Sequence, residues 1–205
     1  MHPFHGLIIG LGNFGDRFIH TRHNYGSMAV QKIVQLAPGQ KHLHLKKLDA
    51  HTHADLYEFS PQGPSHGYYL LARPKTGMNQ SGEAVAVICR DFRISQQDII
   101  VIHDEMGLPL GQARMARSQS PDHHKGLISI EQILDAHDFL RIRLGIGRPQ
   151  QGLTVRQWVM ERFTESEMQI VHSVIDDIWR GITLLCLKDE LKAEHFIHSI
   201  NHPTT

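Results

Sequence analysis

Polar side chains follow two apolar segments that lie far apart in the chain. A glycine-rich turn after residues 7–11 leads to His23, and His103 and Asp104 come directly after the apolar residues 99–102. Short apolar runs of this kind are typical of buried strands, and open α/β sheets bind their ligands at the carboxyl ends of their strands. An imidazole beside a carboxylate can act as a general base whose tautomer the carboxylate fixes. A structural ion pair explains His23 and Asp104 equally well, so these two residues alone leave both interpretations open.

The glycines of the first turn also match a dinucleotide-binding pattern, G-x-G-x-x-G, at Gly10, Gly12 and Gly15. That pattern requires a helix that opens on the last glycine and an acidic residue roughly 20 positions further on. Residues 16–26 have a poor helical pattern, and the region around Gln35 offers no carboxylate. We therefore expect no nicotinamide cofactor, and no other cofactor is predicted.

The surrounding sequence predicts the elements that hold these residues. Helices are expected near residues 27–37, 81–92 and 125–135, and a long amphipathic helix is expected in the C-terminal third, where apolar residues recur at helical spacing from Val171 to Leu185. Strands are expected near residues 7–11, 42–48, 54–60, 67–73, 99–103, 111–117 and 139–145. This alternation predicts an α/β sandwich in which helices flank a mixed central β-sheet, as a single domain over residues 1–205.

Five ordered motifs are spread over nearly the whole chain. They are Gly10-Leu-Gly-Asn13-Phe-Gly15, Thr21-Arg-His-Asn24, Met78-Asn79-Gln-Ser81-Gly82, His103-Asp104-Glu105-Met-Gly-Leu108-Pro109 and Arg141-Ile-Arg143-Leu-Gly145-Ile-Gly147. Together they resemble the motifs of bacterial peptidyl-tRNA hydrolases, which cleave the ester between a peptide and the terminal ribose of tRNA. The resemblance implies that His23 is the catalytic histidine and that Asp104 supports it. It also implies that Asn13 and Asn79 bind the substrate.

The chemistry of ester hydrolysis suits these residue types. A histidine, with an ordinary pKa of roughly 6.5, can take a proton from water near neutral pH, and Asp104 would stabilise the resulting imidazolium of His23. The amides of Asn13 and Asn79 can hold the peptide carbonyl and stabilise an oxyanion. Two structural alternatives remain: Asn13 tolerates a left-handed turn, or Asn79 caps a helix that starts near Ser81.

The chain departs from the family pattern at two places. Where the family has a glycine-rich loop that ends in His-Asn-Gly, residues 118–126 lack the glycines and carry Lys125 at the position of the asparagine. A lysine only donates hydrogen bonds, so Lys125 either contacts tRNA phosphates or makes protonation of His23 more costly. Phe18 stands where the family usually has a tyrosine. We expect substrate contacts from Asn13, Phe18, Met78, Asn79 and Lys125.

These departures keep a second function open. Some relatives of this family bind RNA without hydrolysing peptidyl-tRNA, and Lys125 is compatible with that behaviour. Because His23 and Asp104 are both present, the sequence favours an active hydrolase, with a non-catalytic RNA-binding homologue as the alternative.

Binding of tRNA has to come from the distribution of charge, because 21 basic and 21 acidic residues give a formal net charge of zero. Arginines on neighbouring predicted strands are expected to form a basic patch beside the site. They are Arg114, Arg117, Arg141 and Arg143.

No metal site is predicted, although the chain contains 17 histidines. The close pairs at 42/44, 51/53 and 123/124 have no third ligand at a suggestive spacing.

The composition predicts a cytoplasmic protein, and the resemblance implies that its partner is peptidyl-tRNA; a monomer is expected. No apolar run approaches the ~18 residues of a membrane span, and the N-terminus lacks the pattern of a signal peptide. Cys89 and Cys186 lie in predicted helices without CxxC spacing, so buried reduced thiols are expected.

Overall fold

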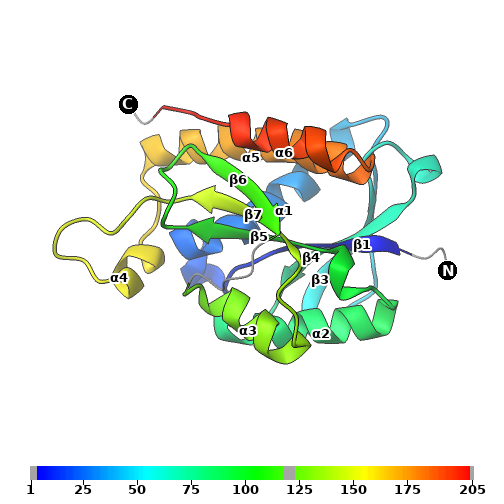
Figure 1. Cartoon of the computed structure of the whole chain (residues 1–205), viewed down its shortest axis with the longest axis horizontal. Coiled ribbons are helices and arrows are strands. Elements are labelled where there is room, and N and C mark those ends of the chain that lie inside the picture. The colour runs from blue at the N-terminus through cyan, green and yellow to red at the C-terminus, as the bar shows by residue number, and fades with distance from the viewer. Residues whose placement is uncertain (1–3, 118–122, 204–205) are drawn as a thin grey trace.

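The computed structural model describes residues 4–117 and 123–203. Within these residues, seven strands form one mixed sheet in the order β2-β3-β4-β1-β5-β7-β6, and helices cover both faces (Figure 1). The predicted fold class is thereby confirmed. The strands are β1 (Phe4–Gly10), β2 (His44–Lys47), β3 (Ala54–Ser60), β4 (Tyr68–Pro74), β5 (Ile99–Glu105), β6 (Ala113–Arg117) and β7 (Leu140–Gly145).

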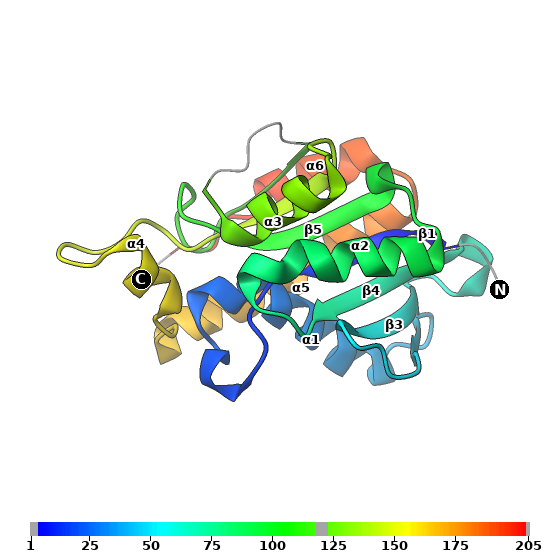
Figure 2. The same ribbon diagram turned by 90° about the horizontal axis from the view of Figure 1, so that it is seen from below.

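Two layers of helices enclose the sheet. Helices α1, α5 and α6 lie on one face (Figure 1), and Figure 2 shows α2 and α3 side by side on the other. The short helix α4 projects at one end of the sheet, where the segment after β1 also lies (Figures 1 and 2). The helices are α1 (Tyr25–Leu36), α2 (Ser81–Phe92), α3 (Lys125–Leu134), α4 (Val155–Met160), α5 (Glu165–Cys186) and α6 (Glu190–Ser199).

The predicted long C-terminal helix is only partly right. Apolar residues from Val171 to Leu185 do form the buried side of one helix, α5. That helix ends at Cys186, and Lys188 then adopts a left-handed backbone conformation with φ 62°. The side chain of Asp189 caps the start of α6 by accepting the N–H of Lys192.

Strand direction decides where the functional residues gather. β1 pairs in parallel with both β4 and β5, and β5 pairs in parallel with β7. The carboxyl ends of these four strands therefore lie at the same edge of the sheet. β2, β3 and β6 join antiparallel at the two sides. This arrangement brings the turn after β1 next to the end of β5.

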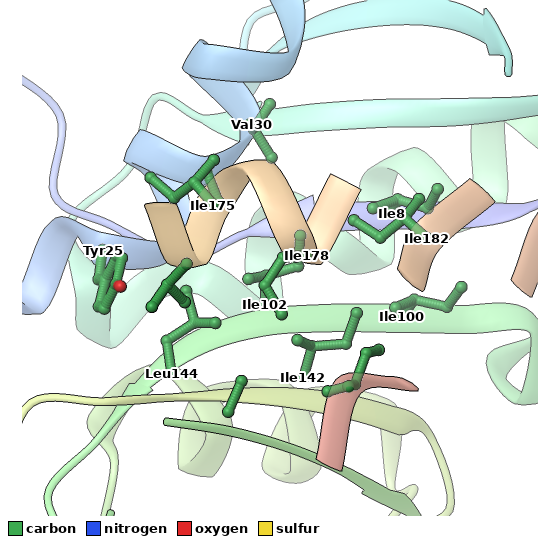
Figure 3. Packing of buried hydrophobic residues seen from close by; sticks show 14 of the residues in the cluster. Ile8, Tyr25, Val30, Ile100, Ile102, Ile142, Leu144, Ile175, Ile178 and Ile182 are labelled. Atoms are coloured by element: carbon green, nitrogen blue, oxygen red, sulfur yellow. The ribbon is translucent and has the colours of Figure 1, made fainter. Parts of the chain in front are cut away.

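The central strands are apolar along their length because both of their faces are covered. Ile8 packs against α1 and α5 in the cluster drawn in Figure 3, together with Ile102 and Ile178. Its neighbours Leu7 and Ile9 point to the opposite face and pack in the second cluster, under α2 and α3. The core thus holds the strand ends rigidly from both sides.

Both cysteines are buried and unpaired, as predicted. Burial raises the pKa of the Cys89 thiol to about 11, which keeps this thiol protonated at neutral pH. Among the described residues, no helix is long and apolar enough to cross a membrane.

Helix α1 approaches the sheet so closely that one position accepts only glycine. A Cβ atom on Gly26 would lie 2.1 Å from the carbonyl oxygen of Ile102. We expect Gly26→Ala to lower the free energy of unfolding by about 1–3 kcal/mol or more, because overpacking forces the backbone apart. Since Gly26 follows His23 by three residues, activity should fall as well. Thermal unfolding and an activity assay check this, with Gly39→Ala as the control because Gly39 has open space around it.

Candidate active site

Paired asparagines shape the turn after β1. The side-chain oxygen of Asn24 accepts the backbone N–H of Asn13 at 2.8 Å, and the Asn24 amide donates to the Asn13 carbonyl at 2.9 Å. The side-chain oxygen of Asn13 in turn accepts the Met78 N–H at 2.9 Å. Because that oxygen is engaged, the NH₂ group is what Asn13 can offer to a ligand.

Neither structural alternative for the asparagines is supported. The positive φ angles in this turn belong to Gly15 and His20, not to Asn13. The N-cap of α2 is Gln80, without a side-chain hydrogen bond, and Asn79 is exposed one residue earlier. A left-handed backbone conformation therefore does not explain Asn13, and a cap of α2 does not explain Asn79.

His23 and Asp104 form a buried pair. His23 lies in a short 3₁₀ helix, Arg22–Asn24, and its Nδ1 is 3.0 and 3.1 Å from the two carboxylate oxygens of Asp104 at the end of β5. Both residues are less than a tenth exposed. An N–H on Nδ1 that donates to Asp104 leaves the Nε2 lone pair of His23 available to a ligand, which is the tautomer a general base requires.

Electrostatics favour this pairing. Burial lowers the pKa of His23, but the charge of Asp104 and the hydrogen bond to it raise the pKa by more, so the pKa lies above the ordinary 6.5. Lys125 acts in the opposite direction and lowers it. Burial raises the pKa of Asp104, while His23 and His124 together lower it well below its usual range. The pair is therefore an ionised carboxylate and a histidine of enhanced basicity.

A third side chain contacts the pair and was not predicted as a site residue. His124 Nε2 is 3.1 Å from Asp104 Oδ1, and the rings of His23 and His124 have centroids 4.8 Å apart. His124 is the N-cap of α3. The sequence signal for it was its place directly before the amphipathic stretch 125–134, where a cap is expected.

Arg22 anchors the histidine segment to the C-terminal helices. Its guanidinium lies 3.9 Å from the centre of the Trp158 ring and 4.8 Å from that of Phe163. It also forms an ion pair with Glu167 at 2.9 Å. The backbone N–H of Arg22 donates to the Glu161 carbonyl at 2.9 Å. These contacts tie the residue next to His23 to α4 and to the start of α5.

His23 and Asp104 line a cavity of about 820 Å³. Val155 and Met160 of α4, both exposed apolar residues, form part of its wall. The structure brings all five predicted substrate-binding residues to this cavity: Asn13, Phe18, Met78, Asn79 and Lys125.

Lys125 is exposed at the first position of α3. Of the unusual segment 118–126, residues 118–122 lie outside the described part of the chain.

The predicted basic patch is wrong for Arg141. This side chain is only 1% exposed, forms an ion pair with Glu131 and stacks on the Phe139 ring, with the guanidinium 4.8 Å from the ring centre. It cannot reach a tRNA phosphate without breaking a buried ion pair, which is costly. Arg141 is a structural residue of the sheet.

The other three arginines do not line the cavity. Arg143 is half-buried and donates to Glu105 at 2.9 Å. Arg114 donates to the Ala113 and His198 carbonyls. Arg117 is exposed on the edge strand β6. A role of these three in tRNA binding stays a prediction.

Comparison with known proteins agrees with this geometry. The sequence profile of the family described as peptidyl-tRNA hydrolase matches residues 7–204. The chain belongs to this family. A peptidyl-tRNA hydrolase of Maridesulfovibrio salexigens is 34% identical over 196 residues, covering 96% of this chain and 94% of the relative. One from Nitratidesulfovibrio vulgaris is 36% identical over 206 residues, covering 95% and 96%.

Solved structures of the family have the same fold. The crystal structure of peptidyl-tRNA hydrolase from Acinetobacter baumannii superposes with a TM-score of 0.83 at 27% identity, covering 98% of this chain and 97% of that one. The expectation drawn from the ordered motifs, that the chain is a peptidyl-tRNA hydrolase family member, is confirmed.

Proposed function

We propose that this protein hydrolyses the ester bond between the peptide and the tRNA in peptidyl-tRNA, with His23 as the general base and Asp104 as its supporting carboxylate. The observation that carries the proposal is the buried hydrogen bond of 3.0 Å between these two residues at the wall of a large cavity, in a chain of this enzyme family. The enzyme acts in translation, since its substrate is peptidyl-tRNA.

The reaction needs only water and the residues of this cavity. His23 Nε2 takes a proton from water while the water oxygen forms a bond to the ester carbonyl carbon. The resulting tetrahedral intermediate then breaks its bond to the ribose oxygen, and the imidazolium of His23 returns the proton to that oxygen. The products are the free peptide acid and tRNA with a free terminal hydroxyl. Asp104 stabilises the imidazolium between these two steps.

Neutral amides supply the second requirement, which is stabilisation of the developing oxyanion. The NH₂ group of Asn13 is held in a fixed direction because its oxygen accepts the Met78 N–H. A donor that is already oriented costs no reorganisation when charge develops. We propose Asn13 and Asn79 as the donors to the peptide carbonyl, with Phe18 and Met78 as apolar contacts in the same cavity.

A single assay separates the enzyme from a non-catalytic RNA-binding homologue. The purified protein is incubated with an N-acylated aminoacyl-tRNA, and the release of free tRNA is followed. Multiple-turnover release supports the proposal. Binding of the tRNA without release would instead support the RNA-binding alternative.

We also propose that the protein acts as a monomer in the cytoplasm, where peptidyl-tRNA arises. All residues assigned to the reaction come from one chain, so the site needs no second copy. Size-exclusion chromatography with light scattering at the assay concentration tests the oligomeric state, and a dimer that dissociates together with loss of activity contradicts the proposal.

We propose that Lys125 contacts a phosphate of the bound tRNA. Lys125→Asn should weaken tRNA binding and reduce the slope of log K against log salt by about one. At a pH above the acidic limb, turnover at saturating substrate should hold or improve, because the lysine lowers the pKa of His23 and its removal makes the imidazole a stronger base. The substitution should not weaken α3, since a cation in the first turn of a helix is unfavourable.

Binding titrations at several salt concentrations check this prediction. Lys192→Asn is the matched control, because Lys192 is an exposed lysine of α6 that does not line the cavity. Faster turnover on a minimal ester without the tRNA body would show instead that Lys125 obstructs the cavity. No effect on either substrate would mean that Lys125 is functionally neutral.

A further inference from the structure

We infer that His124 is a positioning residue of this site: it is held in one tautomer and donates a hydrogen bond that fixes the Asp104 carboxylate against His23. The inference deepens the proposed function and rests on it. His124 contacts Asp104 and does not contact the reacting atoms. The hydrogen bonds of its two ring nitrogens are the basis of the inference.

One nitrogen of His124 has its role set by the backbone. As the N-cap of α3, His124 Nδ1 faces the backbone N–H groups of Gly126 at 3.2 Å and Leu127 at 3.4 Å. A backbone N–H is only a donor, so Nδ1 has to carry a lone pair. Helix capping therefore selects the tautomer of this histidine.

The other nitrogen must then carry the proton. His124 Nε2 lies 3.1 Å from Asp104 Oδ1, and a carboxylate only accepts hydrogen bonds. The bond thus runs from His124 to Asp104. Because His23 Nδ1 contacts the same carboxylate at 3.0 Å, Asp104 receives an N–H from each of the two imidazoles.

A second donor matters because Asp104 is buried. Only 4% of the residue is exposed, and a buried carboxylate that keeps its charge needs hydrogen-bond donors in place of water. With His23 as the sole imidazole donor, the carboxylate would be free to rotate about its last side-chain bond. The bond from His124 removes that freedom and so fixes the direction in which His23 Nε2 faces the cavity.

His103 also contacts Asp104 and His124. Its Nδ1 lies 2.8 Å from the backbone carbonyl of Asp104, and its ring meets that of His124 edge-on at 5.0 Å between centroids. Burial, reinforced by the neighbouring His124, lowers the pKa of His103 to about 3. His103 is thus a neutral packing partner. Among the described residues, the charged or titratable groups near the pair are His103, His124 and Lys125, with Arg141 beyond His103 and with Glu105 and His123 in the wall of the same cavity.

The same geometry argues against a metal ion at this cluster. His23, Asp104 and His124 have ligand atoms within 4.8 Å of one another, and these residue types are the usual ligands of zinc. A metal on His124 Nε2 would require its proton to move to Nδ1. A proton on Nδ1 would face the backbone N–H groups of Gly126 and Leu127. The cap of α3 therefore disfavours the tautomer with a free Nε2, which a metal ligand requires.

The test uses His124→Asn, which separates the two roles of the residue. Asparagine is a favoured N-cap and keeps the acceptor for the α3 N–H groups, but it is too short to reach Asp104. We expect kcat to fall about 10- to 100-fold with KM little changed. The acidic limb of the pH profile should move to higher pH. Without the hydrogen bond from His124, the negative charge of Asp104 stabilises protonated His23 more strongly and raises its pKa.

The control is His137→Asn, since His137 is an exposed histidine beyond the far end of α3. It should keep wild-type turnover and the wild-type pH profile. An unchanged kcat in His124→Asn overturns the inference. A lower kcat with an unmoved acidic limb overturns it too, because that result indicates a purely structural role.

A second measurement does not depend on activity. Long-range ¹H–¹⁵N NMR correlations of the wild-type imidazoles report which nitrogen of His124 carries the proton. The inference requires a protonated Nε2 and a bare Nδ1, and it fails if Nδ1 is protonated or if added Zn²⁺ binds stoichiometrically through Nε2. A protein with the required tautomer but without esterase activity would refute the proposed function and leave the tautomer assignment standing.

Discussion

Replacing His23 by alanine should lower turnover of an N-acylated aminoacyl-tRNA by about 10²- to 10⁴-fold, the usual contribution of a general base. His23 Nε2 is the group proposed to take the proton of the attacking water, and the neighbouring His124 cannot replace it there. His124 turns its protonated nitrogen to Asp104 and its bare nitrogen to the backbone of α3. Steady-state kinetics of tRNA release measure the loss.

The variant should still fold and bind tRNA. Asp104 keeps the hydrogen bond from His124, so the buried carboxylate is not left without a donor. Equilibrium binding and thermal unfolding check both points, and His195→Ala, an exposed histidine of α6, is the control for the substitution itself. Wild-type turnover in His23→Ala would remove His23 from the mechanism.

Much of this site could be predicted from strand ends. His23 follows β1, and Asp104 is the second-last residue of β5; these two strands are parallel neighbours in the sheet. Polar residues after such strands meet at one edge whatever separates them along the chain. That rule alone brings together two residues that are 81 positions apart. The identity of the chemistry came from the ordered motifs.

Other parts could not be predicted, because they depend on contacts that local patterns do not encode. Arg141 sits in a strand whose alternation allowed an exposed side chain. Its buried partner Glu131 belongs to α3, and the pairing exists only after that helix packs on the sheet. The stacking of Arg22 on Trp158 joins residues over a hundred positions apart in the same way.

The role of His124 is a further case. Its capping position is visible in the sequence, but the direction of the second ring nitrogen is not. That direction follows from the placement of α3 against the end of β5, where Asp104 Oδ1 lies 3.1 Å away. The next residue, Lys125, is the clearest departure from the family pattern in the sequence. It is exposed at the wall of the cavity, whereas the buried contact with Asp104 is made by His124.

Asp104→Asn should lower turnover by up to about 10⁴-fold, although the side chain keeps its shape. The asparagine has one oxygen to accept a hydrogen bond where two imidazoles donate to the carboxylate. His124 cannot reverse its bond, since the backbone of α3 fixes its tautomer. The NH₂ group then faces His23 Nδ1 and favours the tautomer with the proton on Nε2, which cannot act as a base.

The pH profile of Asp104→Asn should shift in a defined direction. In the wild type, Asp104 raises the pKa of His23 above 6.5, so activity is lost as the pH falls through a value above 6.5, where His23 becomes protonated. Without the carboxylate that pKa drops, and the acidic limb of the residual activity should move to lower pH. Asp189→Asn is the control, because it exchanges one good helix cap for another outside the cavity. If the pH profile of Asp104→Asn matched that of the wild type, Asp104 would not be coupled to His23, and the hydrogen bond of 3.0 Å between them would be structural only.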